Sequence, residues 1–319
     1  MTRTRTLVAL IAIFALLVVG GLIARRARYS LTVNKVSDDL YVFVGSGMNS
    51  TALITDEGVV LVDTMQDGWW GPALEAELQS ITDKPITTII NTNANASHSG
   101  NNFRFGKGTV EIVSHEATKS RLERSKRFQG ANARHLPKTT FRDRLSLVRG
   151  KERIELYYFG PANTDGDTWV VFPSRRVLHL SDIVSKNDVP EYVRDFGGSG
   201  VSQPETVARG MAALKDIDTV IIGHANGDDP HPMLTWAELD VHRRRSDTLL
   251  TAVREAMKSA TTAEEVAAAV RSGDAFKMYD AKRVNDAVAA IYSELAAARD
   301  RPITFRRGPD LFRPVSSSW

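Results

Sequence analysis

From residue 40 onward, the apolar positions of the chain first repeat with the short period of β-strands. Three β-rich runs occupy residues 40–44, 51–54 and 59–63. Gly45, Gly47 and the turn tripeptide at 56–58 separate them, which predicts a meander of antiparallel hairpins. An amphipathic stretch at 71–81 then precedes an apolar run at 86–91, so the period changes from helix to strand. This alternation is typical of a layered α/β domain.

The same alternation continues to about residue 222. A second strand and helix are expected near residues 110–127, and a later helix over 204–215 leads into a strand over 219–222. Three more strands are expected between them, at 154–159, 168–172 and 176–180. The pattern therefore predicts one α/β domain over residues 29–235.

Beyond Trp236 the composition shifts to alanine, arginine and glutamate with helical spacing. Helices are expected over 239–257, 263–270 and 281–298. We interpret residues 236–299 as a helical extension. Residues 300–319 contain three prolines and no strong period, which predicts a draped or loose tail.

The first 28 residues differ from the rest of the chain. Residues 6–24 form an unbroken, uncharged and mostly aliphatic run with arginines on both sides. As a helix this run would be about 28 Å long, close to the thickness of a bilayer core. It is longer than a usual signal-peptide core, and no cleavage site of small residues follows it. We therefore predict an uncleaved membrane anchor in residues 1–28, with a removed signal segment as the alternative.

The basic isoelectric point of about 9.1 is explained by this segment. Five of the 41 basic residues flank the run, which leaves 36 against 38 acidic ones, so the remaining chain is close to neutral. An excess of this kind is a membrane-flank signature and predicts no nucleic-acid binding. The chain contains no cysteine, which excludes disulfides, thiolate catalysis and cysteine-bound zinc.

Chemistry is expected in the loops that follow strand ends. The loop after the strand at 86–91 contains Asn93, Asn95, Ser97 and His98, followed by Ser99-Gly100-Asn101-Asn102. Four other segments have polar residues at similar places. They are Leu61-Val62-Asp63-Thr64, the run from Gly160 to Asp167 that contains Asn163, Leu180-Ser181-Asp182-Ile183, and Ile222-Gly223-His224.

In their order and surroundings, these segments resemble the metal-ligand motifs of metallo-β-lactamase-fold hydrolases, over about residues 35–230. The resemblance implies an α/β fold that is a four-layer αββα sandwich, with the pocket at one edge between two sheets. It also implies similarity to exported, membrane-anchored members of the family, and hence a main domain in the periplasm or otherwise outside the cytoplasm.

Carried over residue by residue, the resemblance implies two metal positions. The first would be formed by Asn93, Asn95 and Asn163, where the family has histidines. The second would be formed by Ser97, His98, Asp182 and His224, with Ser97 in place of a carboxylate. Asp63 and Asp167 would support the ligands from behind rather than bind metal themselves.

Neutral amide oxygens are poor zinc ligands, so we interpret the first position as lost. His98, Asp182 and His224 remain a two-histidine, one-carboxylate set, which predicts at most one zinc or other divalent ion. Two functions stay open at this point. One is a hydrolase of weak activity with one metal ion, acting on an ester, thioester, amide or phosphoester. The other is a pseudoenzyme without metal that binds a small molecule or partner at the membrane, its three asparagines hydrogen-bonded to one another.

Two further sets of residues carry weaker signals. Ser97, His98 and Asp182 include the residue types of a nucleophilic triad, but neighbours in an extended loop point apart, so this reading is disfavoured. The other histidines match no ligand position of the family and are expected at the surface, at helix caps or in the core. They are His115, His135, His179, His231 and His242.

Overall fold

The computed structural model describes residues 10–11, 13–15, 20–21, 29–186, 188–224 and 231–299. Among these, no helix combines the length and the apolar character that crossing a bilayer requires. Most of the run at 6–24 lies outside the described residues, and so does the tail at 300–319. The predicted transmembrane helix therefore gains no support from the structure.

The first sheet has seven strands in chain order. The first four are antiparallel neighbours, and the parallel pairs begin between β4 and β5, so the sheet is mixed. Its strands are β1 (Thr32–Lys35), β2 (Leu40–Gly45), β3 (Met48–Thr55), β4 (Gly58–Val62), β5 (Ile86–Asn91), β6 (Glu111–His115) and β7 (Thr139–Phe141). The meander predicted from the sequence forms its antiparallel half.

The second sheet has six strands and is also mixed. Only the β11–β12 pair is parallel among its paired strands, and the order across the sheet is β13-β12-β11-β10-β9-β8. Its strands are β8 (Arg144–Arg149), β9 (Glu152–Tyr157), β10 (Trp169–Phe172), β11 (Val177–His179), β12 (Thr219–Ile221) and β13 (Met233–Thr235).

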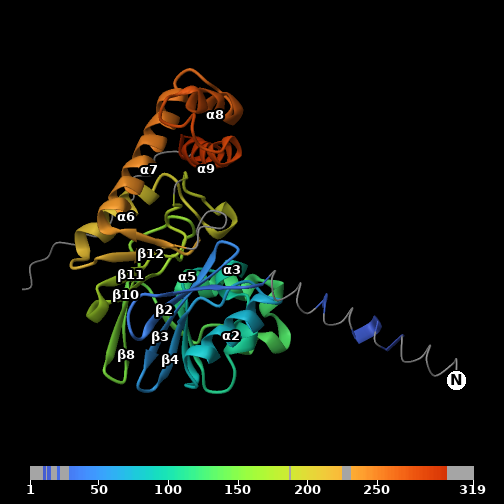
Figure 1. The fold of residues 1–319 in the computed structure, drawn as a ribbon. Coiled ribbons are helices and arrows are strands. Elements are labelled where there is room, and N and C mark those ends of the chain that lie inside the picture. Colours follow the sequence, from blue (N-terminus) through green and yellow to red (C-terminus); the bar gives the residue numbers. More distant parts are fainter. Residues whose placement is uncertain are drawn as a thin grey trace, which may run out of the picture.

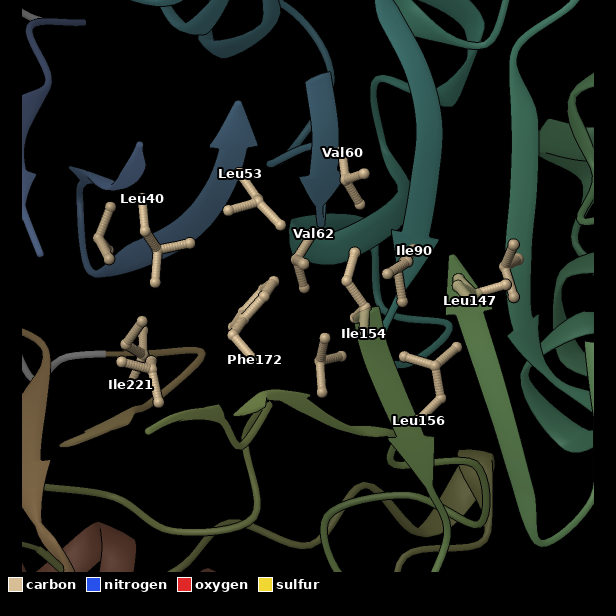
Figure 2. Close-up of a cluster of buried hydrophobic side chains, with 14 of the residues drawn as sticks. Leu40, Leu53, Val60, Val62, Ile90, Leu147, Ile154, Leu156, Phe172 and Ile221 are labelled. Carbon is tan, nitrogen blue, oxygen red and sulfur yellow. The ribbon is translucent and has the colours of Figure 1, made fainter. Parts of the chain in front are cut away.

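The two sheets face each other across an apolar core (Figure 2). Alternate residues of the central strands enter it because side chains of a strand point to opposite faces in turn. Val60 and Val62 of β4 meet Ile154 of β9 and Phe172 of β10 in this core, and all four side chains are fully buried. Val59 and Leu61 of β4 instead point to the opposite face of the first sheet.

Helices cover the outer faces of both sheets (Figure 1). Leu74 and Leu78 of α2 (Trp70–Ile81) pack on the first sheet, and Val207 of α6 (Gln203–Ala213) packs on the second. The order helix, sheet, sheet, helix confirms the predicted α/β fold of the metallo-β-lactamase type. Short helices complete the domain: α3 (Ala96–Ser99), α4 (Asn102–Phe105), α5 (Glu116–Arg124), η1 (Lys126–Phe128), η2 (Gly130–His135), η3 (Pro173–Arg175) and η4 (Arg194–Phe196).

The C-terminal part is helical, as the sequence predicted. It consists of α7 (Trp236–Ala256), α8 (Ala263–Ser272) and α9 (Ala281–Arg299), which lie beyond one end of the two sheets in Figure 1. Thr235 with Glu238 and Thr262 with Glu265 form capping boxes that start α7 and α8. The three helices share an apolar core with Val189 from the segment before α6. The extension is therefore packed against the α/β domain.

Candidate functional site

Three side chains from distant parts of the chain converge at one end of the sheets. His98 lies in α3 after β5, Asp182 follows β11, and His224 follows β12 and forms a bridge with Met48 of β3. One possible ligand atom from each of His98, Asp182 and His224 lies within 4.8 Å of the other two. The structure thus brings together three of the four residues that the sequence analysis assigned to the second metal position, the fourth being Ser97.

Both ring nitrogens of His98 are held by carboxylates. Nδ1 lies 2.7 Å from Oδ2 of Asp63, and Nε2 lies 2.7 Å from Oδ2 of Asp182. Burial lowers the pKa of His98, but the two carboxylates outweigh it and hold this pKa well above its ordinary value. Without a bound ion, His98 is therefore an imidazolium that bridges two acids.

Asp182 connects His98 to the open side of the site. Its second oxygen, Oδ1, lies 2.9 Å from Nδ1 of His224, whose side chain is 39% exposed. Burial raises the pKa of Asp182, but the two histidines outweigh this and keep it well below its usual value. The carboxylate is therefore ionised and shared between one buried and one accessible imidazole.

The backbone around Asp182 is closely fitted. Ser181 has a φ of 59°, in the left-handed region that non-glycine residues rarely adopt. The N–H of Gly223 donates to the carbonyl of Ser181 at 2.6 Å, and a Cβ at Gly223 would overlap Oδ1 of Asp182. Strain of this kind is found at functional sites, where the surrounding structure holds it in place. Here it fixes the direction of the Asp182 carboxylate.

Asp63 supports this arrangement from behind, as the resemblance implied. Its carboxylate accepts from the N–H of Thr92 at 2.8 Å and from the Thr92 hydroxyl at 2.6 Å. Asp63 also has a positive φ, of 61°, at the end of β4. The Thr92 hydroxyl accepts in turn from Ser181 at 2.9 Å, so Thr92 links the two strained strand ends.

The three asparagines bond only partly to one another. The amide of Asn95 donates to Oδ1 of Asn163 at 3.4 Å, and the amide of Asn163 donates to the carbonyl of Glu191 at 2.9 Å. The Asn93 amide group donates to Oγ of Ser181 at 3.1 Å and to Oδ2 of Asp182 at 3.4 Å, while its Oδ1 accepts from the backbone N–H of Asn95 at 2.8 Å. The predicted mutual hydrogen bonding therefore links Asn95 to both of the others, but among these three residues only the bond from Asn95 to Asn163 joins two side-chain amides.

The loop geometry expected around Ser97 is also wrong. Residues 96–99 form the helical turn α3 and not an extended strand, with Asn95 as the residue before its first turn. Ser97 and His98 are consecutive on this turn, and His98 is directed to Asp63 and Asp182. Both ring nitrogens of His98 are thus bonded to carboxylates, so neither is available to take a proton from the Ser97 hydroxyl.

A pocket of about 380 Å³ opens over this site. Its lining is mostly polar, with amides, hydroxyls and charged groups, and two valines. The lining residues are Asn95, Ser97, Asn163, Asp182, Val184, Ser185, Glu191, Val193, His224 and Arg283. Arg283 belongs to α9, so the helical extension contributes directly to the pocket.

Asp167 is fully buried and is held by hydrogen bonds from Thr164. Its carboxylate accepts from the N–H and the hydroxyl of Thr164, both at 2.8 Å. Burial raises the pKa of Asp167 to about 7 although these hydrogen bonds oppose the rise. Asp167 therefore shapes the loop that carries Asn163, and its polar contacts are made within that loop.

Several residues of the site were not predicted from the sequence. Thr92 and Ser181 are ordinary loop residues in the sequence, and their contacts depend on the fold. His179 is fully buried in the core, which is one of the places expected for the histidines that match no ligand position. Its Nε2 nevertheless lies 3.7 Å from Oδ2 of Asp63. Burial lowers the pKa of His179 to about 4, so it is a neutral neighbour of the charged network.

The donor set suits one divalent ion. Two imidazole nitrogens and a carboxylate are the ligands of many open single-metal sites. The contact between Asp63 and Nδ1 of His98 leaves Nε2 as the nitrogen for an ion, which is the usual way in which a carboxylate orients a metal-binding histidine. The amides of Asn93, Asn95 and Asn163 offer no comparable set, because amide oxygens are neutral and those of Asn93 and Asn163 already accept hydrogen bonds from Asn95.

Comparison with known proteins supports the same fold. The sequence profile of the metallo-beta-lactamase superfamily matches residues 44–224, more than half of the chain. The alpha subunit of 2,4-dinitroanisole O-demethylase from Nocardioides sp. (strain JS1661) is 29% identical over 174 residues, covering 52% of this chain and 50% of that protein. The chain thus spans about half the length of this curated relative.

Solved structures are similar at lower identity. A metallo-beta-lactamase from Pontibacter korlensis gives a TM-score of 0.57 at 17% identity, over 67% of this chain and 99% of that one. A stereoselective inverting sec-alkylsulfatase from Pseudomonas sp. gives a TM-score of 0.64 at 14% identity, over 83% of this chain and 50% of that one. At these identities the likeness shows a shared fold.

Proposed function

Because the chain belongs to the metallo-beta-lactamase superfamily, we propose that it is a hydrolase-like protein that binds one divalent metal ion on His98, Asp182 and His224. The observation that carries the proposal is the convergence of these three side chains, of which Asp182 and His224 line an open pocket and His98 is buried against Asp182. When bound, zinc or a similar ion would polarise a substrate bond and activate water.

The chain's own groups have separate tasks in this proposal. Asp63 holds His98 in one orientation through Nδ1, and Asp182 positions both histidines through its two oxygens. The uncharged amides of Asn95 and Asn163 line the pocket at positions where the family has further metal ligands. One carboxylate and neutral ligands offset only part of the charge of two divalent ions, so we propose a single ion and weak hydrolysis.

The substrate class is part of the proposal. The pocket is small and mostly polar, which favours a compact ligand with several hydrogen-bonding groups. The names of the relatives add an aryl methyl ether and a secondary alkyl sulfate to the esters, thioesters, amides and phosphoesters implied by the resemblance. A panel of 4-nitrophenyl acetate, 4-nitrophenyl sulfate, 2,4-dinitroanisole and a chromogenic β-lactam tests the ester, sulfate ester, aryl ether and amide bonds of this set.

The test is metal binding by the full chain. We expect one zinc per chain by elemental analysis after dialysis, and chelator-sensitive turnover of at least one compound of the panel. His224→Ala should lose the zinc, whereas Ser185→Ala, which changes the pocket lining but no ligand, should keep it. A parent chain that takes up no zinc, or two zinc ions, would contradict the proposal.

A second function is favoured by hydrogen bonds among the protein groups of the site. The contacts of His98 with Asp63 and Asp182 and the Asn95–Asn163 pair satisfy polar groups of the site within the protein. A non-catalytic protein that binds a small ligand in this pocket would have the same features. Zinc-free protein that binds a ligand from a metabolite mixture, with no turnover of the panel, would favour this function.

We also propose that residues 6–24 anchor the chain in a membrane, with the α/β domain outside the cytoplasm. The support is the uncharged aliphatic run between arginine-bearing flanks. The near-neutral remainder of the chain gives no support for a nucleic-acid partner. Extraction of membranes with alkaline carbonate tests the anchor: an anchored chain stays in the pellet, and a peripheral or cleaved one is released.

A further inference from the structure

The side of the pocket that faces the helical extension is formed by residues 188–201, here called the wall segment. It leads from the loop after β11 to α6 and contributes Glu191 and Val193 to the pocket. It also holds Asn163, whose amide donates to the carbonyl of Glu191 at 2.9 Å and whose carbonyl accepts from the N–H of Val193 at 2.8 Å. The position of the wall segment therefore sets the position of Asn163.

The first half of the wall segment is held by α7 and α9. Arg283 of α9 lies 3.3 Å from the carboxylates of both Asp188 and Glu191. Arg245 of α7 donates to the carbonyl of Asp188 at 2.8 Å. Val189 and Tyr192, on either side of Glu191, are buried in the apolar core of the extension. This half of the segment is thus packed as part of the extension.

The second half is held by Glu294 of α9. Oε1 of Glu294 accepts from the hydroxyl of Ser199 at 2.5 Å, and Oε2 accepts from the N–H of Val201 at 3.3 Å. Ser199 in turn donates its N–H to the carbonyl of Ala162, next to Asn163, at 2.9 Å. A Cβ at Gly200 would overlap the side chain of Ile291, so the backbone lies directly against α9.

We infer that the helical extension determines the shape of the ligand pocket, with Arg245, Arg283 and Glu294 as positioning residues that hold the wall segment and, through it, Asn163. The contacts at Asp188 and Ser199 lie on either side of the residues that line the pocket. Loss of either contact lets the wall segment move away from the site, since the segment has no regular strand or long helix of its own. Ligand binding therefore depends on Arg245 and Glu294, which do not line the pocket, as well as on Arg283, which does.

The absence of cysteine makes this measurable in the full chain. Val193→Cys places a single thiol on the wall segment at the pocket. Its reaction rate with iodoacetamide measures how accessible this position is to the reagent, and so how far the wall segment has moved away from the site. In this background, Glu294→Ala should raise the rate about tenfold, because two hydrogen bonds are lost. Glu294→Gln keeps one acceptor and should raise it less. Glu255→Gln, which removes an exposed ion pair between Glu255 of α7 and Lys258 just after it, is the matched control and should leave the rate unchanged.

Hydrogen exchange followed by mass spectrometry gives the second measurement. Peptides that cover residues 161–165 and 188–201 should exchange faster in Glu294→Ala, and peptides from β4 and β5 should not. Arg245→Met repeats the test from α7 if Glu294→Ala does not fold. Unchanged thiol and exchange rates in a folded variant would overturn the inference, and so would equal acceleration in β4 and β5, which would mean general destabilisation.

The inference uses the pocket of the proposed function but not its metal ion. Both measurements are made in the presence of a chelator, so a chain that binds no zinc can still support the inference. Conversely, zinc uptake by Glu294→Ala should equal that of the parent, because none of the three ligands lies in the wall segment. Failure of one proposal is thus distinguishable from failure of the other.

Discussion

His98 and Asp63 are joined by a contact of 2.7 Å between Nδ1 of the imidazole and Oδ2 of the carboxylate, and both side chains are almost completely buried. The same oxygen accepts from the Thr92 hydroxyl. This arrangement fixes the ring of His98 so that Nε2 faces Asp182. The orientation of the candidate metal ligand is therefore built into the fold before any ion binds.

Replacing Asp63 should lower the stability of the folded chain, and the size of the loss measures the contribution of this contact. In Asp63→Asn the imidazolium of His98 loses one of its two balancing charges in a buried place. We expect the free energy of unfolding to fall by about 3 kcal/mol, measured by urea denaturation at neutral pH. Asp38→Asn, at an exposed position, should have no measurable effect. A loss at Asp63 no larger than that of the control would mean that His98 is neutral in the folded chain.

Zinc affinity should rise with pH. Because the pKa of His98 is held well above its ordinary value, an ion must displace a proton from Nε2 to bind. Each bound zinc should release about one proton, so the affinity should rise about tenfold per pH unit while His98 remains protonated. Competition with a coloured chelator between pH 6 and 8 measures this slope. An affinity that is constant over this range would show that Nε2 carries no proton.

Asp167 should make stability fall as pH rises. Its pKa is about 7 in the folded chain against an ordinary value of 3.8, so between these values the folded state keeps a proton that the unfolded state has released. The protonated Asp167 carboxyl therefore contributes to the free energy of unfolding. This contribution is complete below about pH 4 and is lost as the pH rises toward 7, at up to about 1.4 kcal/mol per pH unit. Asp167→Asn should remove this slope. Urea denaturation of parent and variant at pH 4.5, 6 and 7.5 gives the difference, which would be constant if Asp167 did not titrate.

Restoring the family's ligands should restore a second ion. Asn93→His, Asn95→His, Ser97→Asp and Asn163→His together rebuild the implied ligand set around His98, Asp182 and His224. We expect two zinc ions per chain by elemental analysis, and a larger gain in metal binding than in turnover, because ligand geometry must be held to about half an ångström. The single variant Asn163→His serves as the control and should stay at one ion. A folded quadruple variant that still binds one ion would show that α3 and the Asn163 loop no longer allow the two-ion geometry.

The long elements of the fold could be predicted because their patterns are set by burial. β4 and β5 are covered on both faces and read as apolar runs, and α7 has a helical period over many turns. The missed strands were short or exposed. β1, β7 and β13 have three or four residues each, and β8 has Arg144, Ser146 and Val148 on its exposed face, so their strand character comes from pairing with a neighbour.

The candidate site could be predicted only in part. The order of the loops after the strand ends was enough to predict that His98, Asp182 and His224 lie close together. The helical turn α3 has no strong helix signal in its four residues, and it forms within the folded loop. Arg283 was assigned to a separate helical extension, and no sequence pattern indicates that a residue of α9 reaches a pocket formed by loops more than fifty positions earlier.

The burial of Val189 and Tyr192 among α7, α8 and α9 also bears on how the chain can be handled. Both belong to the segment before α6, within the part numbered 29–235, yet their apolar surfaces are covered by residues beyond 236. A chain shortened after Thr235 would keep both sheets and expose this surface to water. Such a patch promotes self-association, so the shortened protein should precipitate or form oligomers where the longer chain stays dispersed.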